Sequence, residues 1–232
     1  MAIGILLCAN QLFADPGLVL EPFSATFSVK RNLIPLGELE LKLSLNGTGD
    51  YTYHAHTMPG MLASLFSGDD ILEESHGRIS TDSIRPVRYH YRDEAGKAEN
   101  TELAFDWSNA EVHTSSGGTT WSQPITPGTQ DKLSQQLLVR LDLAHGRKEM
   151  AYQVADGGKI KQYRFRVEGE ERIKTPYGRL DCLRVKRSKA SQPPDYTIWF
   201  AAKLNYLPVK IERQRSGRTY RMVLDELREG SD

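Results

Sequence analysis

Apolar and polar residues alternate along most of this chain, which is the period of half-buried β-strands. In GELELKLSLNGTGDYTYHAHT, residues 37–57, four leucines alternate with charged or polar residues, and the NGTGD turn leads into a second alternating run. RPVRYHYRDEAGKAENTELAFDW, residues 85–107, repeats this form, and further alternating runs follow residue 148. We therefore expect a mainly β protein with a large curved antiparallel sheet, or half-open barrel, of about ten to twelve strands.

One segment has the helical period instead. In PGTQDKLSQQLLVRLDLAHG, residues 127–146, an apolar stripe recurs at helical spacing, Thr129 or Asp131 is placed to cap the start, and Gly146 is placed to end it. This predicts one long helix on the concave side of the sheet, with Asp131 and Ser134 as a first-turn capping pair. No strained turn carrying a nucleophile is visible, so the helix is interpreted as packing. The stripe comprises Leu133, Leu137, Leu138, Leu141 and Ala144.

A second apolar segment, MPGMLASLFSGDD at residues 58–70, predicts a short helical loop. Such a loop either folds onto the core or guards the mouth of an apolar cavity, and the sequence leaves both open. The second alternative makes the concave face a site for a lipid-like ligand. Trp199 alternates with Thr197 and is a further candidate for the cavity lining. The predicted ligand-binding residues are Met61, Leu62, Leu65, Phe66, Leu133, Leu137, Leu141 and Trp199.

The N-terminus, MAIGILLCANQLFADP, has a short apolar run followed by a small residue, as in a secretory signal peptide cleaved after Ala14. No Lys or Arg precedes that run, which departs from the usual pattern. We expect a signal peptide at residues 1–14, a single β-rich domain at 15–232 and a periplasmic location. No apolar run reaches the length of a transmembrane helix. Cleavage would leave Cys182 as the only cysteine, and Leu7 before Cys8 argues against lipidation.

The net charge and the spacing of histidines and carboxylates limit the kinds of functional site that this chain can hold. Lys plus Arg and Asp plus Glu both total 30, so the strongly basic balance of a nucleic-acid binder is absent. His54 and His56 share a strand face, but a zinc site needs three or four ligands and nothing in the spacing supplies them. Alternation places Glu73 and Glu74 on opposite faces, so they do not form a hydrolytic pair. We expect no metal, no cofactor and no catalytic residue.

Several stretches together resemble a known family. They are LEESHGRISTDSIRPVRYHYRD, LAFDW, TPGTQDKLSQQLLVRL, TPYGRLDCLRVKR and WFAAKLNYLPVKIERQRSGRTYRMVLDEL. In this order they resemble the exported bacterial family of domain of unknown function 3108, over about residues 20–227. That family resembles, at fold level, the lipoprotein-carrier half-barrels, in which a curved antiparallel sheet holds helices on its concave side. The resemblance supplies no catalytic residues.

Three functions remain open. The first is an exported, non-enzymatic protein that binds an apolar or amphipathic, lipid-like molecule, or acts in envelope maintenance. The second is a structural module that contacts other envelope proteins. The third is an envelope glycan or lipid hydrolase, with candidates in Glu73, Glu74, His54, His56 and Asp131. The basic residues of the C-terminal strands are interpreted as a solvated outer face, with docking to anionic lipid headgroups as the alternative.

Overall fold

The computed structural model describes residues 20–60, 70–96, 98–190, 192–215 and 217–230. These residues form one 15-stranded sheet, so the expected ten to twelve strands are too few. The order across the sheet is β8-β7-β6-β5-β4-β3-β2-β1-β15-β14-β13-β12-β11-β10-β9, and only the β9–β10 pair is parallel. The strands are β1 (Phe23–Arg31), β2 (Ile34–Leu45), β3 (Asp50–Pro59), β4 (Ile71–Ile79), β5 (Ile84–Asp93), β6 (Thr101–Asp106), β7 (Glu111–Ser116), β8 (Thr119–Pro124), β9 (Gln130–Asp131), β10 (Glu149–Asp156), β11 (Lys159–Lys174), β12 (Arg179–Lys189), β13 (Tyr196–Ala201), β14 (Leu207–Arg215) and β15 (Arg218–Glu229).

The sequence predicts too few strands for an identifiable reason. The hairpin of β7 and β8 reads EVHTSSGGTTWSQP and carries few apolar residues, so hydrophobic alternation barely marks it. The hairpin is marked instead by its turn: Gly117 and Gly118 both have positive φ, as a two-residue hairpin turn requires, and the β-branched Thr119 and Thr120 follow them. β9 is only two residues long and is defined by its pairing with β10.

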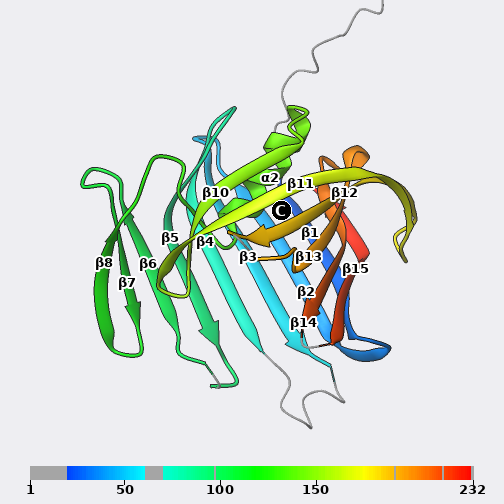
Figure 1. Ribbon diagram of the computed structural model, residues 1–232, viewed down its shortest axis with the longest axis horizontal. Coiled ribbons are helices and arrows are strands. Elements are labelled where there is room, and N and C mark those ends of the chain that lie inside the picture. The colour runs from blue at the N-terminus through cyan, green and yellow to red at the C-terminus, as the bar shows by residue number, and fades with distance from the viewer. Residues whose placement is uncertain (1–19, 61–69, 97, 191, 216, 231–232) are drawn as a thin grey trace, which may run out of the picture.

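The sheet curls until its two halves face each other, with β10–β13 passing in front of β1–β5 (Figure 1). Within the described residues, no ladder joins the two free edges, β8 and β9. Instead β9 lies against β5, where the Gln130 side chain donates to the Ile84 carbonyl at 2.9 Å. Farther along, the Trp121 indole N–H of β8 donates to the Gly158 carbonyl in the β10–β11 turn at 3.2 Å. We call this ladderless junction of β4, β5 and β8 with β9 and β10 the seam.

The helix α2 (Ser134–Ala144) has 11 residues, so the expected long helix is in fact short. It begins late because Gln130 and Asp131 are already used as strand β9. The expected capping pair is confirmed: Ser134 N–H donates to the Asp131 carboxylate, and Asp131 N–H donates to the Ser134 hydroxyl, both at 2.8 Å. The helix ends in a Schellman motif at Gly146, whose φ is +73°.

The core fills the concave side of the sheet around α2. One side of the helix packs with inner-face residues of β1–β6 such as Phe27, Leu41 and Leu103. The opposite side, through Val139 and Leu143, packs against the inner face of β10–β13. The helix therefore plugs one end of the curled sheet, as the sequence predicted. Within the described residues, no helix has the length and apolar content needed to cross a membrane.

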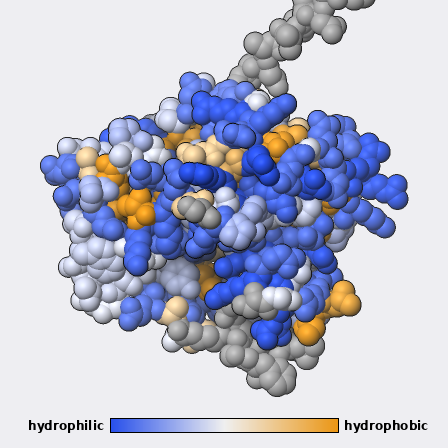
Figure 2. Space-filling model, viewed as in Figure 1, coloured by the Kyte–Doolittle hydropathy of each residue, from blue (hydrophilic) through white to orange (hydrophobic). Residues whose placement is uncertain are grey.

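The expected helical loop at 58–70 is only partly covered by the structure. Met58 and Pro59 belong to β3, while residues 61–69 lie outside the described residues. Figure 2 shows the face formed by β10–β12 as mostly hydrophilic, with separate hydrophobic patches. The apolar positions of these strands accordingly point inward.

Candidate functional site

The predicted ligand-binding residues fall in three places. Leu133, Leu137 and Leu141 are at most 1% exposed and pack within the main core, so they close one end of the interior. Trp199 is buried on the other face of β13 from Ile198, where its indole N–H donates to Glu171 at 2.9 Å. Met61, Leu62, Leu65 and Phe66 lie outside the described residues.

The candidate hydrolytic residues are divided between the two faces of the sheet rather than gathered in one site. His54 pairs with Glu74 at 2.8 Å on the outer face, and the other oxygen of that carboxylate contacts His76. Glu73 points to the inner face, opposite to Glu74 as alternation predicted, and Asp131 lies in the seam. Among the described residues, no group of three or more His, Cys, Asp or Glu is arranged to hold a metal ion.

Cys182 is equally unsuited to nucleophilic chemistry. Its thiol is buried, and burial raises its pKa to about 11. Since the thiolate is the reactive form, this cysteine is interpreted as a core residue.

Asp131 links the helix start to the facing strands through a buried hydrogen-bond network. Its carboxylate accepts from the Ser75 hydroxyl at 2.6 Å and from the Leu133 N–H at 2.7 Å, and Ser75 contacts the Tyr51 hydroxyl at 2.9 Å. Burial raises the pKa of Asp131 to about 6, although these hydrogen bonds oppose the shift. Asp131 is fully buried, so its role is to hold the seam.

Beyond this network, the inner face carries charged groups that meet across the seam. Lys132 pairs with Glu73 at 2.6 Å, and the Tyr89 hydroxyl contacts the same carboxylate. Burial opposes the charge of Lys132, but Glu73 outweighs it and raises the pKa of the lysine. Asp156 on β10 also contributes to the field at Lys132. The Asp156 carboxylate accepts a hydrogen bond from Lys161 at 2.8 Å. Burial alone would raise the pKa of Asp156, but its hydrogen bonds and the neighbouring cations hold it well below the usual range.

The charged groups continue as a cross-strand row of alternating arginines and tyrosines. The pairing partners are Arg187 (β12) with Tyr196 (β13), Tyr196 with Arg213 (β14), Arg213 with Tyr220 (β15), and Tyr220 with Arg31 (β1). The Arg187 guanidinium carbon lies 3.8 Å from the Tyr196 ring centroid, and that of Arg213 lies 5.2 Å from it. Directly paired residues share a face, so the five side chains line the interior together.

The six cations of this region have few counter-ions. Among the described residues, Arg187 pairs with Asp195, while Arg213 and Arg31 make no ion pair. The Nε atoms of Arg187 and Arg213 are buried and have no hydrogen-bond partner. Buried N–H donors without acceptors are costly, so an acceptor that reached them would stabilise this region. We call the set the inner basic band: Lys132, Lys161, Lys189, Arg187, Arg213 and Arg31, with Tyr163, Tyr196 and Tyr220 between them.

An apolar row runs beside the inner basic band. Ile198, Ile211 and Met222 are paired across β13, β14 and β15, each two residues from a member of the band on its own strand. Two residues along a strand span about 7 Å, so the two rows are neighbours. The three apolar side chains are only half-buried. The interior at this end thus offers an accessible apolar strip next to a strip of cations.

Sequence reasoning missed this site, although part of its signal was present. Alternation places Arg187 and Lys189 on the face of Val185, which is fully buried, and Arg213 on the face of Ile211. The interpretation of the C-terminal basic residues as a solvated outer face is therefore wrong for these three. It holds for Arg164 and Arg166, which are exposed on the outer face of β11.

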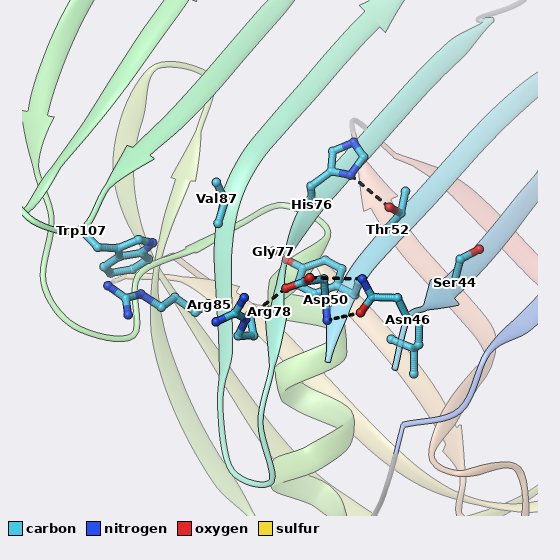
Figure 3. A pocket seen from close by; sticks show the side chains of 12 residues that line it. Ser44, Asn46, Asp50, Thr52, His76, Gly77, Arg78, Arg85, Val87 and Trp107 are labelled. Atoms are coloured by element: carbon cyan, nitrogen blue, oxygen red, sulfur yellow. Dashed lines mark hydrogen bonds and ion pairs between the residues drawn. The ribbon is translucent and has the colours of Figure 1, made fainter. Parts of the chain in front are cut away.

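A separate open pocket of about 650 Å³ lies on the outer face, near the β2–β3 and β4–β5 turns (Figure 3). Arg78 and Asp50 face each other there in an ion pair of 3.0 Å. The Arg85 guanidinium lies over the Trp107 ring, 5.1 Å from its centroid, and Trp107 is fixed by a 2.7 Å hydrogen bond to the Pro86 carbonyl. Both cations of this pocket thus have a partner, whereas in the inner basic band Arg213 and Arg31 make no ion pair within the described residues.

Comparison with known proteins gives a family and a fold. The family profile described as "Protein of unknown function (DUF3108)" matches residues 26–225. No curated protein matches the chain significantly. Among solved structures, the chain is similar to a beta-barrel-like protein of the domain of unknown function DUF1849 from Brucella abortus, with a TM-score of 0.61 and 11% identity. The match covers 92% of this chain and 100% of that one, and at this identity it supports the fold alone.

Proposed function

Since this chain belongs to the DUF3108 family, whose description assigns no function, we propose its function from the geometry. The protein is an exported, non-enzymatic binding protein that holds an amphipathic, lipid-like molecule inside its curled sheet. This role is compatible with a part in maintaining the cell envelope.

The observation that carries the proposal is the pairing of two rows on the inner face. The half-buried row of Ile198, Ile211 and Met222 offers apolar contact, and the neighbouring inner basic band offers hydrogen-bond donors. Ligand sites are mostly apolar with a few convergent polar groups, and this combination meets that description. The leucines of α2 close the interior behind the site.

Binding is tested with full-length protein and three amphiphiles that share a dodecyl chain: the maltoside, the phosphocholine and the phosphate. Native mass spectrometry below the micelle-forming concentration should show a retained adduct with at least one of them. Ile211→Asp should lose the adduct, because it places a charge in the apolar row. Leu33→Asp changes a side chain that is 88% exposed and should retain it.

Absence of every adduct in the folded wild type would refute the binding function. Equal loss in Ile211→Asp and Leu33→Asp would place the ligand elsewhere. Circular dichroism of both variants establishes that the fold is intact. A structural module contacting other envelope proteins predicts no adduct with any of the three.

Export is proposed from the N-terminal sequence. The apolar run and the small residue Ala14 fit a cleaved signal peptide. Expression in a bacterium with two membranes, followed by fractionation, should place the protein in the periplasm with Asp15 as its first residue. Recovery from the cytoplasm with Met1 still present would contradict this.

A further inference from the structure

We infer that the molecule held inside the sheet carries an anionic head, of the phosphate or carboxylate class, and that the head lies on the inner basic band. This inference rests on the proposed function and specifies the ligand for the same site.

The first support is the imbalance of charge in the band. Six cationic side chains line it, while within the described part of the chain the carboxylates they contact are three: Glu73, Asp156 and Asp195. Asp156 is shared by Lys161 and Lys189, at 2.8 and 3.4 Å. The lysines are about a third exposed and Arg187 is 11% exposed, so water screens their mutual repulsion only in part, and an anion placed among them would relieve it. An anionic head supplies that charge, whereas a sugar or zwitterionic head leaves the excess in place.

The second support is the state of the guanidinium groups. The Arg187 side chain is 11% exposed, and its Nε finds no acceptor although its terminal nitrogen reaches Asp195 at 2.9 Å. The Nε of Arg213 is likewise buried and without a partner. Guanidinium groups bind carboxylate and phosphate through planar, paired N–H donors. Tyr196 lies between the two arginines and stacks with both, which fixes their spacing in advance of binding.

The third support is the position of the band relative to the apolar row. The two rows lie about 7 Å apart, two residues along each strand. A single-chain amphiphile has its charged head directly attached to its apolar chain, so both parts reach their rows at once. A free inorganic anion would use the band alone and gain nothing from Ile198, Ile211 and Met222.

The test compares heads on a constant chain. Titration calorimetry with full-length protein should show dodecyl phosphate binding at least about tenfold more tightly than dodecyl maltoside, since hydrogen bonds to charged groups contribute on the order of that factor. Inorganic phosphate should bind far more weakly than dodecyl phosphate. The double variant Lys189→Gln/Arg213→Gln should abolish the preference for phosphate while leaving maltoside affinity within about twofold.

Two matched controls locate the effect. Lys186→Gln removes a cation from the outer face of the strand that carries Lys189. Arg85→Gln removes a cation from the outer pocket. Both should keep the preference for dodecyl phosphate.

The outcomes separate the inference from the proposed function. Equal affinity for the maltoside and the phosphate would overturn the anionic head and leave amphiphile binding standing. Binding of neither would overturn both. Inorganic phosphate binding as tightly as dodecyl phosphate would overturn the amphiphile, since the chain would then contribute nothing. Loss of the preference in Arg85→Gln, with the Lys189→Gln/Arg213→Gln variant unaffected, would overturn the assignment to the inner basic band.

Discussion

At the scale of single residues, the inside of this molecule contains buried polar groups whose charge is opposed by burial. Asp131 is fully buried with a pKa of about 6, while an exposed aspartate has a pKa near 3.8. Because the folded pKa is raised, the protonated form is favoured in the folded state. Protonated Asp131 therefore contributes to the free energy of unfolding. This contribution is fully present below pH 3.8 and is lost as the pH rises through 6.

This gives a testable pH dependence. Between pH 4 and pH 6.5, the free energy of unfolding of the wild type should fall relative to Asp131→Asn by about 2 kcal/mol, since asparagine is neutral throughout. Urea unfolding at several pH values measures the difference. Asp106 is the matched control. It is exposed, and hydrogen bonds from Asn109 and Ser108 lower its pKa, so Asp106→Asn should lose stability relative to the wild type only above the acidic range. A constant difference between wild type and Asp131→Asn would contradict the assignment.

Arg140 is a second buried charge, and it lies apart from the inner basic band. It is 3% exposed, its Nε donates to the Asn205 carbonyl at 3.0 Å, and one terminal nitrogen has no partner. Its guanidinium lies 5.0 Å from the Phe23 ring centroid. Burial lowers its pKa to about 10, which shows how unfavourable the charge is there.

Replacing the charge while keeping the volume should therefore stabilise the protein. Arg140→Met keeps apolar contact with Phe23 and removes the buried cation, so the free energy of unfolding should rise by about 1–2 kcal/mol. Arg140→Ala loses the contact as well and should be less stable than Arg140→Met by about 1–3 kcal/mol. Urea unfolding at pH 7 compares the three proteins. A methionine variant less stable than the wild type would show that the Asn205 hydrogen bond outweighs the cost of burying the charge.

At the scale of elements, hairpin turns and helix ends are set by local chemistry. Gly157 and Gly158 form the β10–β11 turn with φ of +59° and +70°, the left-handed values that a type I′ turn needs. At Gly158 there is a further constraint, because a Cβ atom would lie 2.3 Å from the Trp121 ring of β8. Gly157 has only the end of the Lys161 side chain nearby, at 3.6 Å.

The two glycines therefore form a matched pair. Gly157→Ala should cost about 1 kcal/mol for its left-handed backbone. Gly158→Ala should lower the free energy of unfolding by the same amount and by about 1–3 kcal/mol more. The added methyl group displaces the Trp121 indole and breaks its hydrogen bond to the carbonyl of residue 158. Urea unfolding gives the costs, and a red shift of tryptophan emission in Gly158→Ala alone reports the displaced ring. Equal costs and unchanged emission in both variants would show that β8 does not depend on this contact.

The same elements show what the sequence could predict. Strands with apolar alternation, the capping pair of Asp131 and Ser134, and the helix end at Gly146 follow from local patterns and agree with the structure. The helix start does not, because Gln130 and Asp131 pair with a strand that comes later in the chain. The β7–β8 hairpin was not predicted, because its stability comes from turn geometry and β-branched residues rather than from an apolar face.

At the scale of the whole molecule, the candidate site arises from registers that no local pattern contains. Alternation predicts to which face of the sheet Arg31, Arg187 and Arg213 each point. It does not place them in one row across five strands, because hairpin turns and bulges fix each register. Nor does it bring Lys132 to Glu73, which lie 59 residues apart in the chain and meet only when the sheet curls.

In the curled sheet, β1 is held by more backbone hydrogen bonds than β9. β1 is paired along its length on both sides, by β2 and β15. β9 has a two-residue ladder on one side, and across the seam it is held through side chains, by Gln130 to the Ile84 carbonyl and Ser75 to Asp131. Regions with few backbone hydrogen bonds open at lower free energy than fully laddered ones. We therefore expect the seam to open without global unfolding, which would give the proposed amphiphile a route to the interior.

Hydrogen exchange followed by mass spectrometry tests this opening. Peptides covering residues 130–144 should exchange faster than peptides of β1, although both segments are buried. Gln130→Ala removes a buried hydrogen bond across the seam and should accelerate the first set by about tenfold, corresponding to about 1.4 kcal/mol, with β1 unchanged. Gln162→Ala, on the exposed outer face of β11, should accelerate neither. If Gln130→Ala accelerates all peptides alike, the seam opens only with the whole molecule, and entry must instead occur at the end of the interior lined by the inner basic band.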